Sequence, residues 1–244
     1  MKPYYQDDAI TLYCGDMRDI LPALSLTADA IVTDPPYGQT PLEWDIWPDG
    51  WVKAALSVAP QLWCFGSFRM FLERRDDFSE WNYAQEIIWE KHNGSGFMND
   101  RFRRVHELAV HFYRGKWSDL YNNTPIIAGG YESPKRVAGP PHQRQIGKYA
   151  AQDKEGRLQR SVISVRSCHG YAIHPTQKPE GIVRPLLQCS VPPRGLVLDC
   201  FASSGTTLAV ARELGMKAVG IEGKEEFCAK IVDRLSQSGF QFTS

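Results

Sequence analysis

The 244-residue sequence lacks several features that would place it in a class at once. No apolar run approaches the roughly 20 residues of a membrane-spanning helix. Six cysteines are scattered along the chain without a C-x-x-C pair, so we expect neither disulfides nor a metal site. The first eight residues carry no apolar signal core, and we therefore expect a cytoplasmic protein.

The sequence also lacks net charge, which taken alone argues against a nucleic-acid partner. The charge is unevenly distributed, however. Between Lys91 and Arg166 there are fourteen Lys or Arg and six Asp or Glu, a balance of +8. A basic span in a neutral chain is typical of a surface that contacts phosphates, although an ordinary solvated surface explains it as well.

Strand and helix patterns alternate at both ends of the chain. Strands are predicted at residues 10–14, 30–33, 61–66, 83–90, 108–113, 196–199 and 218–222. Helices are predicted at residues 16–24, 51–59, 68–77, 179–188, 205–214 and 224–236. This alternation predicts an α/β fold with a doubly wound, mostly parallel sheet.

The middle of the chain has a different composition. Residues 118–166 are rich in Gly, Pro, Asn, Gln and Ser and show few apolar periods. Connections of that length are usually functional or partly disordered. We therefore divide the chain into residues 1–117, an insertion at 118–166, and residues 167–244, with the two flanking parts forming one domain.

The stretch Thr33-Asp34-Pro35-Pro36-Tyr37-Gly38 ends the predicted strand at residues 30–33. Proline has no N–H for a strand ladder and restricts the residue before it, so two prolines stop the strand abruptly. The strand end then presents a carboxylate, a rigid backbone and an aromatic ring together. A proline turn that caps a buried strand, with Tyr37 in the core, is the plain alternative.

A second strand–turn–helix pattern runs from Leu196 to Thr207, with small residues in the turn. Such a turn lets the backbone approach a ligand and directs helix N–H groups at it. Glu222 ends the next strand, where a carboxylate can accept hydrogen bonds from ribose hydroxyls. Because neither a P-loop lysine nor a G-x-G-x-x-G pattern is present, a nucleoside ligand without polyphosphate fits best.

Three segments together resemble the DNA amino-methyltransferases. Asp34-Pro35-Pro36-Tyr37 is similar to the catalytic motif of that family, and Asp199 to Gly205 is similar to its cofactor loop. His174-Pro175-Thr176-Gln177-Lys178-Pro179 resembles the segment that precedes the cofactor strand in one branch. The order of these motifs matches the permuted beta class. Gly15-Asp16 and Arg104-Val105-His106-Glu107 are smaller similarities.

The resemblance implies a circularly permuted, Rossmann-like class I methyltransferase fold with an inserted DNA-recognition segment. It implies S-adenosylmethionine as cofactor and double-stranded DNA as partner. It also implies a prokaryotic or phage origin, a homodimer, and a companion restriction nuclease for many members. The cofactor-binding residues that it implies are Asp16, His174, Thr176, Lys178, Asp199, Phe201, Ser203, Gly205, Thr206 and Glu222.

Several of these residues have plain alternatives. Asp16 fits a helix cap nearly as well, and Lys178 fits a solvated lysine equally well. Asp199 and Glu222 fit ordinary acids at strand ends. The sequence departs from the family pattern F-x-G-x-G at Ser203, where a serine has less backbone freedom than the usual glycine but keeps hydrogen-bonding ability.

The Asp-Pro-Pro-Tyr trio suits the chemistry of an exocyclic amine. The lone pair of such an amine is delocalised into the base, and two acceptors on its hydrogens would draw it out of conjugation. Asp34 can supply one acceptor and the carbonyl of Pro35, held by Pro36, the other. Tyr37 can stack on a base that has left the duplex. No cysteine follows a proline, so carbon-5 cytosine methylation through a thiolate is excluded.

The inserted segment contains basic residues suited to DNA contact, namely Lys135, Arg136, Arg144 and Lys148. Arginine can bind guanine with two hydrogen bonds, and nearby glutamines can bind adenine. Contacts to phosphates alone remain the alternative. After the Asp-Pro-Pro-Tyr motif, residues 39–48 hold Trp44 and Trp47, which either cover the extruded base or anchor the loop to the core.

Adenine N6 is the expected target, because in the beta class an aspartate before Pro-Pro-Tyr goes mostly with adenine. Cytosine N4 is the runner-up, since the same pocket geometry would hold it. A non-catalytic DNA-recognition subunit is a third hypothesis, opposed by the intact Asp34 and Tyr37. Methylation of a protein glutamine or a small molecule usually goes with Asn-Pro-Pro-Tyr, and it would leave the basic span without a purpose.

Overall fold

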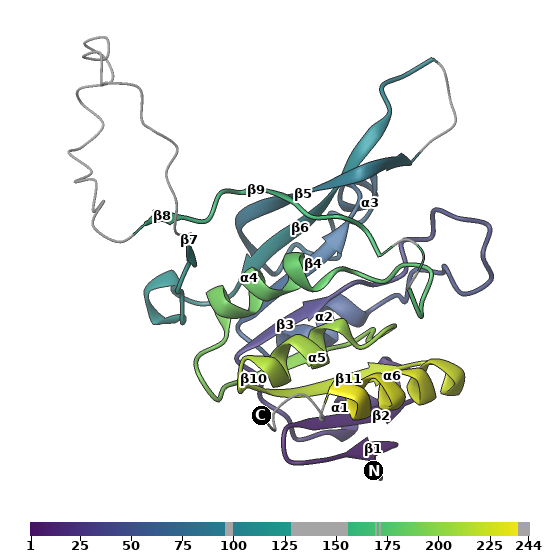
Figure 1. Ribbon diagram of the computed structural model, residues 1–244. Helices are drawn as coiled ribbons and strands as arrows, with labels where there is room; N and C mark the ends of the chain where they lie inside the picture. Colours follow the sequence, from purple (N-terminus) through teal and green to yellow (C-terminus); the bar gives the residue numbers. More distant parts are fainter. Residues whose placement is uncertain (96–99, 128–155, 169, 171, 239–244) are drawn as a thin grey trace.

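The computed structural model describes residues 1–95, 100–127, 156–168, 170 and 172–238 (Figure 1). Its strands are β1 Tyr5–Gln6, β2 Ile10–Cys14, β3 Ala30–Thr33, β4 Gln61–Gly66, β5 Asn82–Ser95, β6 Arg104–Tyr113, β7 Ile126–Ile127, β8 Arg157–Leu158, β9 Val162–Ser164, β10 Leu196–Asp199 and β11 Lys217–Glu222. Its α-helices are α1 Met17–Ala23, α2 Trp51–Leu56, α3 Phe68–Glu73, α4 Glu180–Ser190, α5 Thr206–Glu213 and α6 Glu225–Ser238.

The main sheet has the order β1-β2-β11-β10-β3-β4-β6-β5-β9. Neighbouring strands from β2 to β4 run parallel, as do β5 and β9. The pairs β1–β2, β4–β6 and β5–β6 are antiparallel. The predicted α/β fold with a mostly parallel sheet is therefore confirmed.

Strands β5 and β6 extend beyond the predicted residues 83–90 and 108–113. They form an antiparallel pair that projects from the body of the molecule (Figure 1). Strand β9 falls within the predicted insertion at 118–166 but pairs with β5 in the main sheet. Residues 128–155 lie outside the described residues, so the division of the chain at 118 and 166 stays a prediction.

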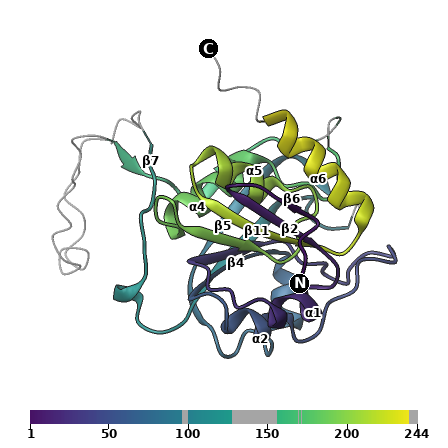
Figure 2. The ribbon, with the colours of Figure 1, turned by 90° about the horizontal axis from the view of Figure 1, so that it is seen from below.

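Helices cover both faces of the sheet (Figure 2). On one face, α4, α5 and α6 bury residues such as Leu187, Val210 and Ile231 against the inner strands. On the other face, α1, α2 and α3 bury a second cluster that includes Trp51 and Met70. Removal of these apolar side chains from water is the main force that holds the layers together. The doubly wound arrangement follows from helices on both faces.

The parallel order brings distant loops to one edge of the sheet. Strands β3 and β10 are neighbours although β10 lies more than 160 residues later, with Val197 opposite Ala30 and Leu198 opposite Ile31. The loops after β3, β10 and β11 therefore all leave from the carboxyl edge. In open α/β sheets ligands bind outside this edge, so the fold itself indicates where to look for a site.

No helix within the described ranges is long and apolar enough to cross a membrane. All six cysteines lie within those ranges and are free thiols.

Gly205 offers a test of how the β10–α5 turn is built. It caps α5 in the left-handed region with φ 71°, and a Cβ there would lie 2.9 Å from Cγ2 of Ile231. We expect Gly205→Ala to lower the free energy of unfolding by roughly 2–3 kcal/mol, from backbone strain plus crowding. Urea titration measures this loss.

Gly215→Ala is the matched control, because Gly215 has φ 68° and no atom within 4 Å of the added carbon. It should lose only the backbone part, about 1 kcal/mol. Equal losses for the two variants would contradict the role of Ile231.

Candidate active site

A cavity of about 1210 Å³ opens at the carboxyl edge of the sheet. Its wall includes the loop after β3, the segment before α4, and the loops after β10 and β11. The residues that line it include Asp34, Pro35, Pro36, Tyr37, Glu107, His174, Thr176, Lys178, Phe201, Ser203, Glu222 and Phe227. The structure thus brings most of the predicted site residues into one space.

Asp34 and Tyr37 contact each other inside this cavity. The Tyr37 hydroxyl lies 2.6 Å from Oδ1 of Asp34 and 2.7 Å from Oε1 of Glu107. The side chain of Asp34 is only 14% exposed. Burial, helped by the charge of Glu107, raises the pKa of Asp34, and Lys178 offsets only part of that rise.

Lys178 forms ion pairs with two carboxylates. Its Nζ contacts Oδ2 of Asp34 and lies 3.1 Å from Oε1 of Glu107, while Lys91 holds the other Glu107 oxygen at 2.5 Å. Burial alone would raise the pKa of Glu107, but the two lysines outweigh it and lower that pKa to about 2. Burial likewise opposes the charge of Lys178, yet Asp34 and Glu107 raise its pKa to about 12. Glu107 is therefore ionised and Lys178 protonated.

The turn after β10 forms the other end of the cavity. Asp199 is buried and accepts hydrogen bonds from the Thr33 hydroxyl at 2.7 Å and the Phe201 N–H at 3.2 Å. Burial raises the pKa of Asp199 to about 6. Phe201 and Ser203 line the cavity, and Ser203 adopts φ 52°, in the left-handed region. That conformation explains why a glycine is usual at this position.

Glu222 ends β11 and lies at the cavity wall. Its oxygens accept the N–H of Ser203 at 2.8 Å and the N–H of Lys224 at 2.9 Å. Each carboxylate oxygen has a second lone pair, so both can still accept a hydroxyl. Burial raises the pKa of Glu222. Glu222 therefore offers hydrogen-bond acceptors that fit ribose hydroxyls, and Phe201 lines the same cavity.

His174 and Thr176 also line the cavity. Nδ1 of His174 is 3.0 Å from the Thr176 hydroxyl, and its ring packs edge-on against Phe227 at 4.3 Å. Burial, together with the positive charge of Lys178, lowers the pKa of His174 to about 4, so its imidazole is neutral at pH 7. This pair presents a neutral polar surface to a ligand.

Four predicted cofactor residues, Asp16, Asp199, Gly205 and Thr206, are not among the residues that line this cavity. Asp16 caps α1 and pairs with Arg18. Gly205 and Thr206 lie behind the turn, where the Thr206 hydroxyl donates to the carbonyl of Lys178 at 2.9 Å. Asp199 and Thr206 instead line a small second cavity, which shares Asp34, Lys178 and Ser203 with the first. A cofactor contact of Asp16 stays a prediction.

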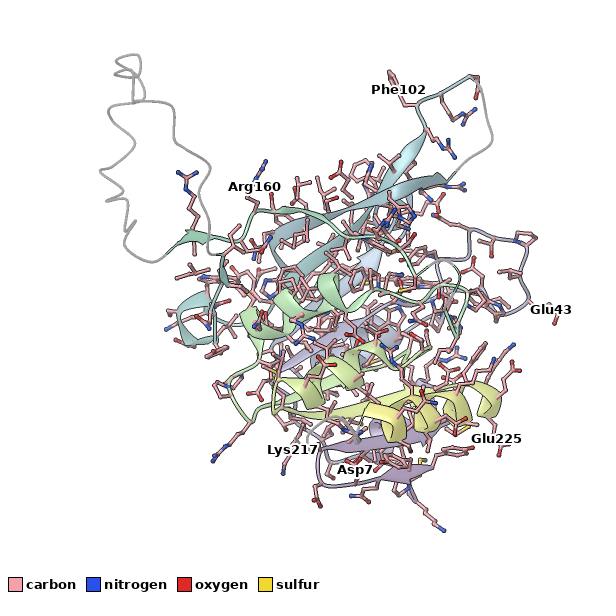
Figure 3. All side chains as sticks on the ribbon, in the orientation of Figure 1. Asp7, Glu43, Phe102, Arg160, Lys217 and Glu225 are labelled. Atoms are coloured by element: carbon pink, nitrogen blue, oxygen red, sulfur yellow. The ribbon has the colours of Figure 1, made fainter. Side chains whose placement is uncertain are left out.

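The two tryptophans in the loop at residues 39–48 lie in different environments. Trp47 is buried and packs against Trp51 at 5.7 Å, so it anchors the loop to the core. Trp44 lines the cavity and lies 5.8 Å from the ring of His174. The tip of the loop faces outward, as Glu43 does in Figure 3.

Two acidic residues escaped the sequence analysis. Asp45 is buried and accepts the N–H groups of Gly38, Gln39 and Thr40 at 2.7–2.9 Å, which fixes the loop after the Asp-Pro-Pro-Tyr motif. Glu107 was noted only as part of a minor similarity. An acid followed directly by an apolar strand, as in Glu107 to Val110, was the available signal.

The predicted DNA contacts Lys135, Arg136, Arg144 and Lys148 lie outside the described residues. Within the described residues, no group of three or more His, Cys, Asp or Glu is arranged to hold a metal ion.

Comparison with known proteins agrees with the fold that the sequence predicts. Residues 28–233 match the model of the N6/N4 family described as DNA methylase. Since the match spans more than half of the chain, this protein belongs to that DNA methylase family. The predicted resemblance is confirmed.

Among curated proteins, the chain is 25% identical to the type II methyltransferase M.HinfI of Haemophilus influenzae, over 97% of this chain and 71% of the relative. It is 24% identical to M.ScaI of Streptomyces caespitosus, over 96% and 84%. Among solved structures, the M1.HpyAVI–SAM complex has a TM-score of 0.64 at 24% identity, over 93% and 100%. The cytosine-N4-specific PvuII DNA methyltransferase has 0.62 at 18%, over 100% and 89%. These structures show that the fold is shared.

The buried carboxyl of Asp199 predicts a pH dependence of stability. Its pKa in the folded protein, about 6, is above the ordinary value of 3.8. Its favourable contribution is therefore present below pH 4 and is lost as pH rises through 6. Relative to the native protein, Asp199→Asn should gain roughly 3 kcal/mol between pH 4 and pH 8, measured by urea unfolding without ligand.

Asp45→Asn is the control with the opposite sign. Burial opposes the charge of Asp45, but hydrogen bonds from Thr40 and the loop N–H groups outweigh it and lower its pKa. This variant should lose stability relative to the native protein as pH rises through the acid range. A flat profile for Asp199→Asn would show that the Asp199 carboxyl titrates normally.

Proposed function

We propose that this DNA methylase transfers a methyl group to N6 of adenine at specific sites in double-stranded DNA. The observation that carries the proposal is the meeting of Asp34 and Pro35 with Phe201, Ser203 and Glu222 in one cavity. A target base held by Asp34 and Pro35 would face a methyl donor whose nucleoside is held by the other three residues. The target base must leave the duplex to reach this depth.

The target amine would lie between two acceptors. The Asp34 carboxylate takes one of its hydrogens and the Pro35 carbonyl takes the other, so the nitrogen lone pair turns toward the methyl group. The ring of Tyr37 supports the base by stacking, a contact of roughly 1–3 kcal/mol per base. No side chain forms a covalent bond to the base in this scheme. Rate enhancement comes from positioning and electrostatics.

As a member of this family, the chain uses S-adenosylmethionine, which supplies the methyl group on a sulfonium. Glu222 would accept the ribose hydroxyls, and Phe201 would pack beside the adenine. Ser203 allows close backbone approach through its left-handed conformation. His174 and Thr176 offer polar groups to the remainder of the donor.

Adenine is proposed over cytosine because an aspartate opens the Pro-Pro-Tyr motif, which the family resemblance links to adenine. Cytosine N4 is the second candidate, and the shared fold with the cytosine-N4-specific PvuII enzyme favours it. A non-catalytic subunit is disfavoured by the assembled cavity. We also propose that the protein acts in the cytoplasm of a bacterium or of a phage-infected cell, because both relatives are bacterial. The proposal includes a homodimer and a companion restriction nuclease.

The product identifies the target. DNA incubated with the protein and S-adenosylmethionine should yield N6-methyladenine on digestion and nucleoside mass spectrometry. Asp34→Ala should lower the methylation rate by a hundredfold or more, because it removes the side chain that accepts a hydrogen of the target amine. Its affinity for S-adenosylmethionine should stay within a few-fold.

Asp76→Asn, an exposed acid after α3, is the control and should keep the native rate. If the product is N4-methylcytosine, the target is cytosine and not adenine. An active Asp34→Ala would contradict the catalytic assignment.

The inserted segment is proposed to read DNA. Arg136→Ala or Arg144→Ala should weaken DNA binding at least tenfold, because each removes a charge that can contact phosphate or guanine. Affinity for S-adenosylmethionine should not change. Titration of each variant with DNA and with cofactor separates the two, and equal losses in both would count against this segment as the reader.

A further inference from the structure

Two hydrogen-bond donors at the centre of the cavity are each shared by the same two carboxylates. The Tyr37 hydroxyl lies 2.6 Å from Asp34 and 2.7 Å from Glu107. The Lys178 ammonium contacts Asp34 and lies 3.1 Å from Glu107. Glu107 is thus within hydrogen-bonding distance of both donors that contact Asp34.

This sharing matters because the proposed function asks Asp34 to hold an N–H of the target base. A carboxylate already paired with an ammonium has much of its charge neutralised, so it is a weaker acceptor for a further hydrogen. The Tyr37 hydroxyl occupies the other oxygen of Asp34. Asp34 becomes a strong acceptor for the amine only when the Tyr37 hydroxyl and the Lys178 ammonium bind another acceptor.

The donors cannot simply leave, because a buried donor without a partner carries a large desolvation cost. Lys178 is buried, and its Nζ also lies 5.2 Å from the ring of Phe65. Its backbone is held by the Thr206 hydroxyl. A short shift of the ammonium toward Glu107 keeps it paired, whereas a move to solvent does not.

Glu107 is built to receive them. Its second oxygen is fixed by Lys91 at 2.5 Å, and the Lys91 ammonium lies 4.5 Å from the centre of the Trp89 ring. The carboxylate is only 12% exposed, and Glu107 lies on β6, between β4 and β5 in the sheet, rather than on a loop. It is therefore a rigid, charged acceptor that faces Asp34 across the two shared donors.

We propose that Glu107 is a positioning residue that takes over the Tyr37 hydroxyl and the Lys178 ammonium when the target base enters, and so frees the charge of Asp34 for the amine. This inference rests on the proposed role of Asp34. No proton is transferred in this exchange, and the ring of Tyr37 stays in place to stack on the base.

Glu107→Gln tests the proposal with an isosteric side chain that lacks the charge. The single-turnover rate of methyl transfer should fall about tenfold or more, because the amide holds an ammonium poorly and Lys178 stays on Asp34. Affinities for DNA and S-adenosylmethionine should remain within threefold. The loss thus appears in kcat rather than in KM.

Two variants bracket this measurement. Glu90→Gln removes an exposed carboxylate from the neighbouring strand β5 and should keep the native rate. Glu107→Asp restores the charge on a shorter side chain and should recover part of the loss. Thermal unfolding of each variant sets a temperature at which all remain folded. A folded Glu107→Gln with the native rate would overturn the proposal.

A double-mutant cycle with Tyr37→Phe separates positioning from a merely structural ion pair. With the hydroxyl absent, Glu107 has one donor fewer to take over, so the loss from Glu107→Gln should be smaller than in the native background. Independent losses that multiply would overturn the inference. An active Asp34→Ala would instead overturn the proposed function, so the two failures are distinguishable.

Discussion

The parallel pairing of β3 with β10 is the constraint on which the site depends. The pairing joins strands that are far apart in sequence, and the Thr33 hydroxyl donates to Asp199 across it at 2.7 Å. Because parallel neighbours end at the same edge, the turn that carries Asp34 and the turn that carries Phe201 open into one cavity. Neither half of the chain contains both ends of the site, so the site is complete only after the sheet has formed.

A balanced group of buried and half-buried charges holds the other walls together. Asp34 and Glu107 face Lys178 and Lys91, and the four come from the loop after β3, from β6, from the segment before α4 and from β5. A buried charge that loses its partner costs several kcal/mol, so each segment is held in place by the others. The same balance lets a donor pass from one carboxylate to the other without loss of a counter-ion, which is why an ion pair can lie at a reacting centre.

Sequence patterns predicted the features that local chemistry determines. The predicted strands at residues 30–33 and 61–66 coincide with β3 and β4, because proline, glycine and apolar runs mark their ends within a few residues. The cavity placement of Asp34 and Glu222 followed from their positions at strand ends. The partner of Lys178 could not be predicted, since its contact with Asp34 spans 144 residues and depends on how strands assemble. Glu107 escaped for the same reason, because only the β4–β6 pairing brings it to the cavity.

Ser203 shows that the cavity requires a backbone conformation rather than a particular residue. The family pattern has glycine there, and the φ of 52° explains the preference, because a side chain in that region is strained. In this chain the Ser203 hydroxyl donates to the carbonyl of Phe201 at 3.1 Å, which offsets part of the strain. The left-handed turn also directs the Ser203 N–H at Glu222, at 2.8 Å. The serine therefore keeps one of the two backbone hydrogen bonds that orient the Glu222 carboxylate at the cavity wall.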